Sequence, residues 1–150
     1  MKQSAGILPF KKVGKDIHVF LAHPGGPYWR KRDQGAWSIV KGEFEQNEEA
    51  LVAARREFEE ETGHALAGEF IHLSPIVQVN RKRVFAFAVE ADLDTRILSN
   101  TFEIEWPPKS GHTQSFPEVD RAGWFEIHEA ERWIRPDQIS LLRELNAKLG

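Results

Sequence analysis

Apolar and polar residues alternate near the start of the chain in the pattern expected of strands. Ile17, Val19 and Leu21 alternate with the residues between them, which predicts a strand over 17–22 with one clearly apolar face. The neighbouring patterns predict a strand at 7–11, a turn at 12–15, a break at 24–27, a loop at 28–35 and a short strand at 37–40.

The spacing of apolar residues changes to that of a helix after residue 47. Leu51, Ala54 and Phe58 stand at i, i+3 and i+7, which places them on one face of a helix packed against the core. Asn47 is suited to cap its first turn. Gly63 is suited to end it, since glycine readily adopts the left-handed conformation found there.

The second half of the chain combines strand and helix patterns. Residues 84–89 are apolar throughout, which predicts a central strand covered on both faces. Residues 101–114 contain Trp106-Pro107-Pro108 and Gly111, which predicts a long surface loop. The other predicted elements are strands at 70–79, 83–91 and 124–127 and helices at 129–134 and 137–149. This order predicts an α/β fold, a mixed β-sheet between helices, in a single domain over residues 1–150.

Composition narrows the class of protein. The chain has no cysteine, which excludes disulfides and thiolate metal sites. Its net charge of −3 argues against general nucleic-acid binding through a basic surface. Its apolar runs are too short for a signal peptide or a membrane-spanning helix, so we expect a cytoplasmic location. The oligomeric state cannot be read from the sequence.

Acidic residues are concentrated in the segment 43–61. If the stretch 42–63 is helical, Glu57, Glu60 and Glu61 stand at i, i+3 and i+4 and share one face. Carboxylates this close repel each other unless a cation offsets the repulsion. Mg²⁺ takes oxygen ligands of this kind and pairs them with substrate phosphates. The segment therefore indicates metal-assisted chemistry on a phosphorylated substrate.

The spacing of this segment is more specific than that of an ordinary acidic helix. Gly42 is followed after five residues by Glu48, and Glu48 after seven residues by the run from Arg56 to Gly63, REFEEETG. This pattern resembles the Nudix box, G-x5-E-x7-R-E-U-x-E-E-x-G-U, in which U is an apolar residue. The last position departs from it, because His64 stands where the family usually has an aliphatic residue.

The resemblance implies the Nudix fold and hydrolysis of a nucleoside diphosphate linked to another group, by water attack on phosphorus. It makes Glu57, Glu60 and Glu61 the metal ligands, with Mg²⁺ as the cofactor and Mn²⁺ as an alternative. Glu57 is also the first candidate for the base that deprotonates the attacking water. Arg56 would orient these carboxylates through charge-assisted hydrogen bonds.

Two further positions of the box, and the residue just before it, have implied roles. Glu48 would pair with a basic residue such as Arg56, and Gly42 stands where the backbone turns tightly before the helix. The carbonyl of Lys41 would join the metal shell, and its side chain would reach a phosphate, as in relatives with a Pro-Lys-Gly entry. Val40 replaces the proline of that entry here.

Family members often add a glutamate from a loop before the last strand. Glu118 is the best candidate here, with Glu103 and Glu105 as competitors. Outside the box, three aromatic residues in predicted loops could stack on a nucleobase: Tyr28, Trp29 and Trp106. The basic runs 30–32 and 81–83 are interpreted as solvated surface, with contact to substrate phosphates as the alternative. Trp37 and Trp124 are expected in the core, and structural or solvent-facing positions are expected for His23, His64 and His112.

Dinucleoside polyphosphates and nucleoside triphosphates are the favoured substrates, and nucleotide sugars and capped RNA ends remain open. The expected partner is a small-molecule nucleotide, with no membrane. One alternative is a Nudix-fold module that senses a nucleotide without cleaving it, although such modules often have eroded boxes and this box is intact. Another is a simple cation-binding acidic domain.

Overall fold

A seven-stranded mixed sheet is built around the first strand. The computed structural model describes residues 2–150. In it β1 (Gln3–Val13) pairs in parallel with β6 (Arg83–Glu90). It pairs antiparallel with β2 (Asp16–Pro24) and with β3 (Val40–Glu43). Because β3 lies directly against β1, the start of the Nudix-like segment is anchored to the centre of the sheet.

Three further strands complete the sheet. β9 (Val119–Glu126) extends it beyond β2, and the two short strands β4 (Ile71–His72) and β5 (Ile76–Val77) pair with β6. One strand was expected over 70–79. It is divided because Ser74 and Pro75 lie between the two pieces, and proline has no N–H to donate to a ladder.

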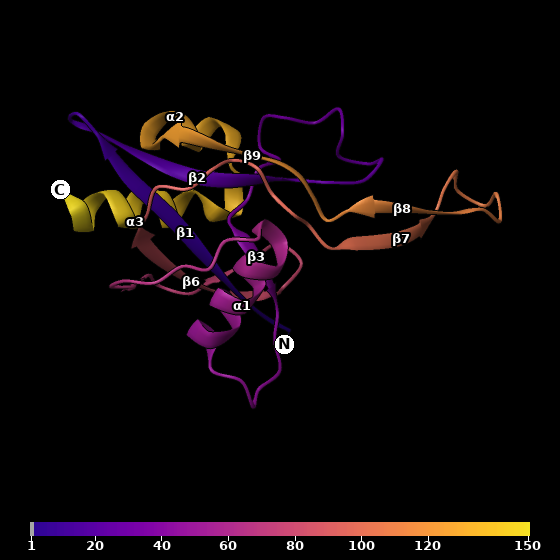
Figure 1. Cartoon of the computed structure of the whole chain (residues 1–150), viewed down its shortest axis with the longest axis horizontal. Helices are drawn as coiled ribbons and strands as arrows, with labels where there is room; N and C mark the ends of the chain where they lie inside the picture. Colours follow the sequence, from indigo (N-terminus) through magenta and orange to yellow (C-terminus); the bar gives the residue numbers. More distant parts are fainter. Residues whose placement is uncertain (1) are drawn as a thin grey trace.

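Helices cover both faces of the sheet (Figure 1). α1 (Ala50–Thr62) packs on one face, through a cluster that includes the fully buried Phe58. On the other face lie α2 (Ile127–Trp133), the 3₁₀ segment η1 (Pro136–Gln138) and α3 (Ile139–Leu149). Side chains of β6 enter both clusters, so the expected central strand with two covered faces is confirmed, as is the α/β fold.

The expectation of a long surface loop over 101–114 is wrong. β7 (Thr101–Glu105) and β8 (Thr113–Pro117) form a separate two-stranded sheet that projects from the rest of the molecule (Figure 1). Phe102 and Ile104 alternate with exposed residues, which is a strand pattern. The prolines and Gly111 belong only to the turn between the two strands.

Several helices and strands also begin at other residues than predicted. Asn47 does not cap α1; the helix begins after Glu49, which makes no side-chain capping bond. The short strand expected at 37–40 begins only at Val40, while Trp37 and Ser38 form isolated bridges. The last strand starts earlier than expected, and Glu126 caps α2 by accepting from the backbone N–H groups of His128 and Glu129. Within residues 2–150, no helix is both long and apolar enough to cross a membrane.

Candidate active site

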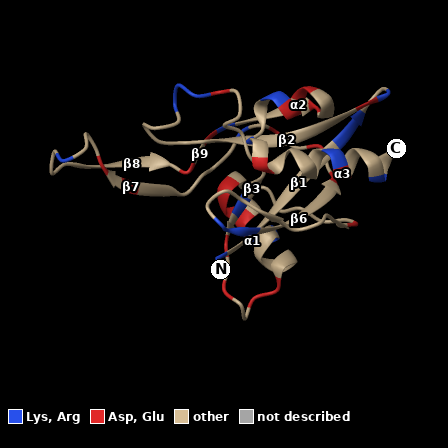
Figure 2. Ribbon diagram, turned by 180° about the vertical axis from the view of Figure 1, so that it is seen from behind, with Lys and Arg blue, Asp and Glu red and all other residues tan. Residues whose placement is uncertain are grey.

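The end of α1 sets the position of the acidic residues. The helix ends at Gly63, which has a φ of 81° and donates its N–H to the carbonyl of Glu59 at 2.8 Å. A residue with a Cβ would be strained in this left-handed conformation. Acidic residues on α1 and on the loop before it appear as red segments in Figure 2. The last turn of the helix buries Glu61, which is 3% exposed.

Glu57 lies against β3. A methyl group added to Gly42 would overlap the carboxylate of Glu57, so only glycine leaves room for it. Burial raises the pKa of Glu57, Arg56 opposes this shift, and the charges of Glu60 and Glu118 add to it. Gly42 therefore allows the helix and the strand to approach each other at the carboxylate.

Arg56 connects three of the glutamates. Its Nε and Nη2 donate to the two carboxylate oxygens of Glu48, both at 3.0 Å. Its Nη1 donates to Glu57 at 2.9 Å and to Glu60 at 3.5 Å. The hydrogen bond from Arg56 lowers the pKa of Glu48. Two parallel bonds to one carboxylate fix the guanidinium plane, and Arg56 in turn fixes Glu57.

The carboxyl group of Glu61 lies near that of Glu118, which stands between β8 and β9. Ser99 Oγ donates to Glu61 at 2.9 Å, and Asn100 Nδ2 donates to it at 3.4 Å. Burial, followed by a hydrogen bond with the Glu118 carboxyl, raises the pKa of Glu61 to about 7. Two carboxyl groups this close share a proton more readily than they both ionise. Ser99 and Asn100 were not identified from the sequence, because nothing in their local pattern indicates a contact with α1.

The carboxylates fit a hard divalent cation by donor type. Within residues 2–150, no three acidic or histidine side chains are gathered closely enough to form a ready metal-binding group. Glu57, Glu61 and Glu118 nevertheless lie close enough for their charges to raise the pKa values of Glu57 and Glu61. A divalent cation would offset that repulsion with the oxygen ligands it prefers.

A cavity of about 590 Å³ opens beside the Glu61–Glu118 pair. Its size is that of a small-molecule site. Lys41 and Trp29 also line it, whereas Glu57, Glu60 and Tyr28 do not. Tyr28 instead contacts the ring of Trp106 edge-on, with 5.2 Å between centroids. The structure therefore brings Glu61, Glu118, Lys41 and Trp29 to one cavity and leaves Tyr28 outside it.

Lys41 is a half-buried cation in this cavity. Burial, with the nearby charges of Lys82 and Arg135, lowers the pKa of Lys41 to about 8. Lys82 pairs with Glu43 at 3.6 Å, and Arg135 donates to Asp137 at 2.6 and 2.8 Å. No ion pair or hydrogen bond of the Lys41 amine is found anywhere in residues 2–150. An anionic ligand would therefore meet an available ammonium group.

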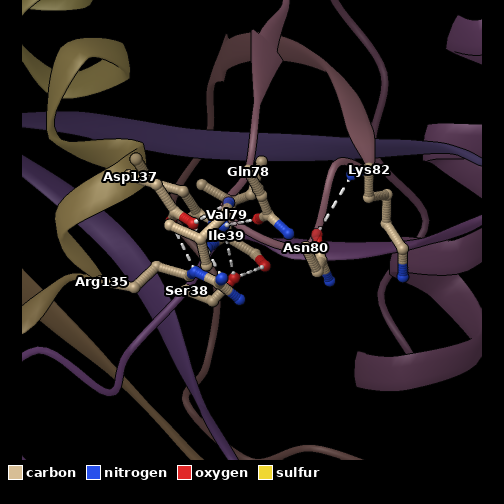
Figure 3. Close-up of polar contacts among 9 residues, drawn as sticks. Ser38, Ile39, Gln78, Val79, Asn80, Lys82, Arg135 and Asp137 are labelled. Carbon is tan, nitrogen blue, oxygen red and sulfur yellow. Dashed lines mark hydrogen bonds and ion pairs between the residues drawn. The ribbon is translucent and has the colours of Figure 1, made fainter. Parts of the chain in front are cut away.

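Figure 3 shows a polar network that includes several residues of the cavity lining, among them Ser38, Ile39 and Asp137. The buried Gln138 accepts from Ile39 N at 3.0 Å and donates to Ser38 Oγ at 3.0 Å and to Gln78 at 3.1 Å. Asp137 accepts from Val79 N at 3.3 Å. These bonds join η1 to the segments that lead into β3 and β6, so they fix the wall from which Lys41 extends.

The other candidates lie outside the cavity. Glu103 and Glu105 are exposed on β7, where Glu105 accepts from Lys109 N at 2.7 Å. The basic run Arg30-Lys31-Arg32 is exposed on its loop. Trp37 is buried and Trp124 packs against the core, as expected of structural residues.

The sequence matches the family model described as NUDIX domain over residues 2–145. No curated protein matches it at a significant level. Three solved structures illustrate the similarity of fold. An Ap4A hydrolase of C. elegans in a binary complex is 19% identical, with a TM-score of 0.67 and 97% of each chain covered.

The other two structures are similarly distant in sequence. The NUDIX domain of Shewanella oneidensis NrtR complexed with ADP ribose is 11% identical, with a TM-score of 0.68, covering 99% of this chain and 88% of that one. A mutT/nudix family protein from Listeria innocua is 18% identical, with a TM-score of 0.58, covering 99% and 93%. Identities this low show a shared fold.

Proposed function

This chain belongs to the Nudix family and is a hydrolase of phosphoric anhydride bonds, and from that premise we propose that it is a Mg²⁺-dependent pyrophosphohydrolase of a nucleoside diphosphate-linked substrate. A dinucleoside polyphosphate or a nucleoside triphosphate is the favoured substrate. One observation carries the proposal: the Glu61–Glu118 pair and the unpaired ammonium of Lys41 line the same cavity.

The substrate class draws support from the solved relatives. The C. elegans protein is an Ap4A hydrolase, and the NrtR domain is complexed with ADP ribose. Both compounds contain a nucleoside joined through a phosphoric anhydride. The cavity offers such a compound the ring of Trp29 for stacking and the amine of Lys41 for a phosphate.

Glu57, Glu60, Glu61 and Glu118 would hold Mg²⁺, or Mn²⁺ in its place. When bound, such an ion supplies positive charge against the phosphate oxygens and acidifies water. Glu57 accepts the proton of the attacking water, and Arg56 holds its carboxylate in place at 2.9 Å. Lys41 binds a phosphate oxygen. Glu48 fixes Arg56, and Gly42 leaves the space that Glu57 occupies.

A panel of nucleoside diphosphate derivatives tests this function. Purified protein is incubated with each compound, with Mg²⁺ or with chelator, and the products are separated by chromatography. Metal-dependent cleavage of a compound would support the proposal, and the product pair would identify the phosphorus attacked. Nucleotide binding without product, with either Mg²⁺ or Mn²⁺, would favour the sensing module instead. Metal binding with no preference for phosphorylated ligands would favour the acidic cation-binding domain.

A further inference from the structure

His23 is a buried polar residue beside the cavity that the proposed reaction does not use. It lies near the end of β2 and is 0% exposed. Its Nδ1 is 2.8 Å from a carboxylate oxygen of Asp120, and its Nε2 contacts the carbonyl oxygen of Arg32. Both ring nitrogens therefore have an oxygen partner, one on β9 and one on the loop that follows β2.

Further contacts surround this pair. Arg121 lies 3.9 Å from the same oxygen of Asp120. Arg121 also pairs with Asp33 at 3.7 Å, and Asp33 accepts from Trp37 Nε1 at 2.6 Å. Loss of either partner would leave a buried polar group without its hydrogen bond, so His23 and Asp120 act as a unit.

The first segment held by His23 carries Glu118. The pairing of β2 with β9 shifts register between His23 and Pro24: His23 lies opposite Arg121 and Pro24 opposite Val119, which leaves Asp120 as the extra residue. Such a bulge redirects a side chain, here toward His23. Gly25 N also donates to the carbonyl of Glu118 at 2.9 Å. His23 therefore contacts the chain two residues after Glu118, at the bulge that follows it.

The second segment is the loop from Gly25 to Ala36. His23 contacts this loop through its Nε2, which lies against the carbonyl oxygen of Arg32. The guanidinium of Arg32 lies over the ring of Trp29, 5.7 Å from its centroid, and Arg32 N donates to the carbonyl of Trp29 at 2.8 Å. Trp29, Gly35 and Ala36 all line the cavity. His23 thus joins two walls of the site, one bearing an acidic residue and the other an aromatic ring.

We propose that His23 is a positioning residue that holds Glu118 and the loop of Trp29 in the arrangement needed to bind metal and substrate. It has this role only if the proposed hydrolase function holds, because the role acts through the residues of that site. His23 itself is not among the residues that line the cavity. Its loss should therefore weaken metal binding and loosen the loop while leaving the fold in place.

The test compares His23→Gln with His128→Gln. His128 is a matched control, because its Nδ1 also lies 2.8 Å from a carboxylate, that of Glu126, but its side chain is 70% exposed and remote from the cavity lining. Mn²⁺ alone is titrated into each protein by electron paramagnetic resonance. Amide hydrogen exchange of residues 25–36 is measured on the same samples, with circular dichroism to verify folding.

We expect the His23→Gln protein to bind Mn²⁺ at least roughly 10-fold more weakly, as found when residues that orient metal ligands are removed. Exchange in 25–36 should be faster, with His128→Gln unchanged in both measurements. Folded His23→Gln with wild-type exchange and affinity would overturn the proposal, as would faster exchange without loss of affinity. If the wild type itself binds no Mn²⁺, the proposed metal site fails, and the proposed role of His23 in metal binding fails with it.

A second variant keeps the test decisive if His23→Gln does not fold. Asp120→Ala removes the oxygen that faces His23 Nδ1 and leaves His23 in place. We expect the same changes in Mn²⁺ affinity and exchange. Wild-type behaviour of folded Asp120→Ala would contradict the positioning role of the His23–Asp120 contact.

Discussion

The carboxylate of Glu57 on α1 rests against the backbone of Gly42 on β3, in space that any side chain at Gly42 would fill. β3 is itself paired with the central strand, where Gly42 lies opposite Ala5. The position of this carboxylate is thus fixed from two sides, by the strand beneath it and by Arg56 at 2.9 Å. Gly42 and Glu57 are distant in the sequence, and they meet in space because α1 packs against β3.

Gly42→Ala should displace Glu57 and reduce turnover. A displacement of about 1 Å at a reacting group can cost roughly 100-fold in rate, and the overlap should also lower the free energy of unfolding by about 1–3 kcal/mol. The matched control is Gly123→Ala in β9, where the nearest atom to an added Cβ is 3.4 Å away. Turnover and urea unfolding of both variants check this; equal activity in the two would contradict the packing argument.

Substrate binding should weaken as the pH rises through about 8, because Lys41 loses its charge there. Below this pH the ammonium is present and pairs with phosphate. Above it, loss of a charge-assisted hydrogen bond should raise KM roughly 10-fold. Lys41→Arg keeps its charge across this range and should flatten the profile. Measurement of KM from pH 6.5 to 9.5 checks this prediction. An equal rise in KM in the Lys41→Arg protein would assign the pH dependence to another group.

Trp29 and Tyr28 should differ in their importance for substrate binding. Trp29 lines the cavity and is 40% exposed, whereas Tyr28 lies outside it against Trp106. Loss of a stacking ring costs about 1–3 kcal/mol, so Trp29→Ala should raise KM roughly 10-fold or more, and Tyr28→Ala should raise it much less. Steady-state kinetics on both variants check this prediction. A larger rise in KM for Tyr28→Ala than for Trp29→Ala would contradict it, and would indicate that the substrate binds toward the β7–β8 hairpin.

Without metal, stability should fall as the pH rises from about 4.5 to about 7. Glu61 has a pKa of about 7 in the folded protein against an ordinary value of 4.5. In this interval the folded protein retains a proton that the unfolded chain has released, so raising the pH favours unfolding. Urea unfolding in chelator at pH 5 and pH 7 should show the fall, and Glu61→Gln should reduce it. An identical pH dependence in the variant would remove Glu61 as its source.

Local sequence patterns were sufficient for much of the fold and for the acidic end of the site. The alternation at Ile17, Val19 and Leu21, the stripe ending at Phe58 and the all-apolar run 84–89 each specify how one element is buried. These patterns concern residues that are close in sequence, and burial of an amphipathic face is what stabilises them.

The remaining features depend on contacts between distant segments. Ser99 reaches Glu61, and His23 reaches Asp120, only after the sheet and α1 have packed. No local spacing reports such pairs. The β7–β8 hairpin was missed for a different reason: the turn residues Pro107, Pro108 and Gly111 outweighed the alternation of Phe102 and Ile104 in the sequence interpretation.

The most direct test of the proposed chemistry is the turnover of Glu57→Gln and Glu61→Gln on the best substrate of the panel at saturating Mg²⁺. Each substitution preserves side-chain size while removing a carboxylate, and loss of a base or metal ligand should reduce turnover at least roughly 100-fold. Glu59→Gln, an exposed position on the same helix, should behave as wild type. Unchanged turnover in folded Glu57→Gln and Glu61→Gln proteins would contradict the proposed mechanism.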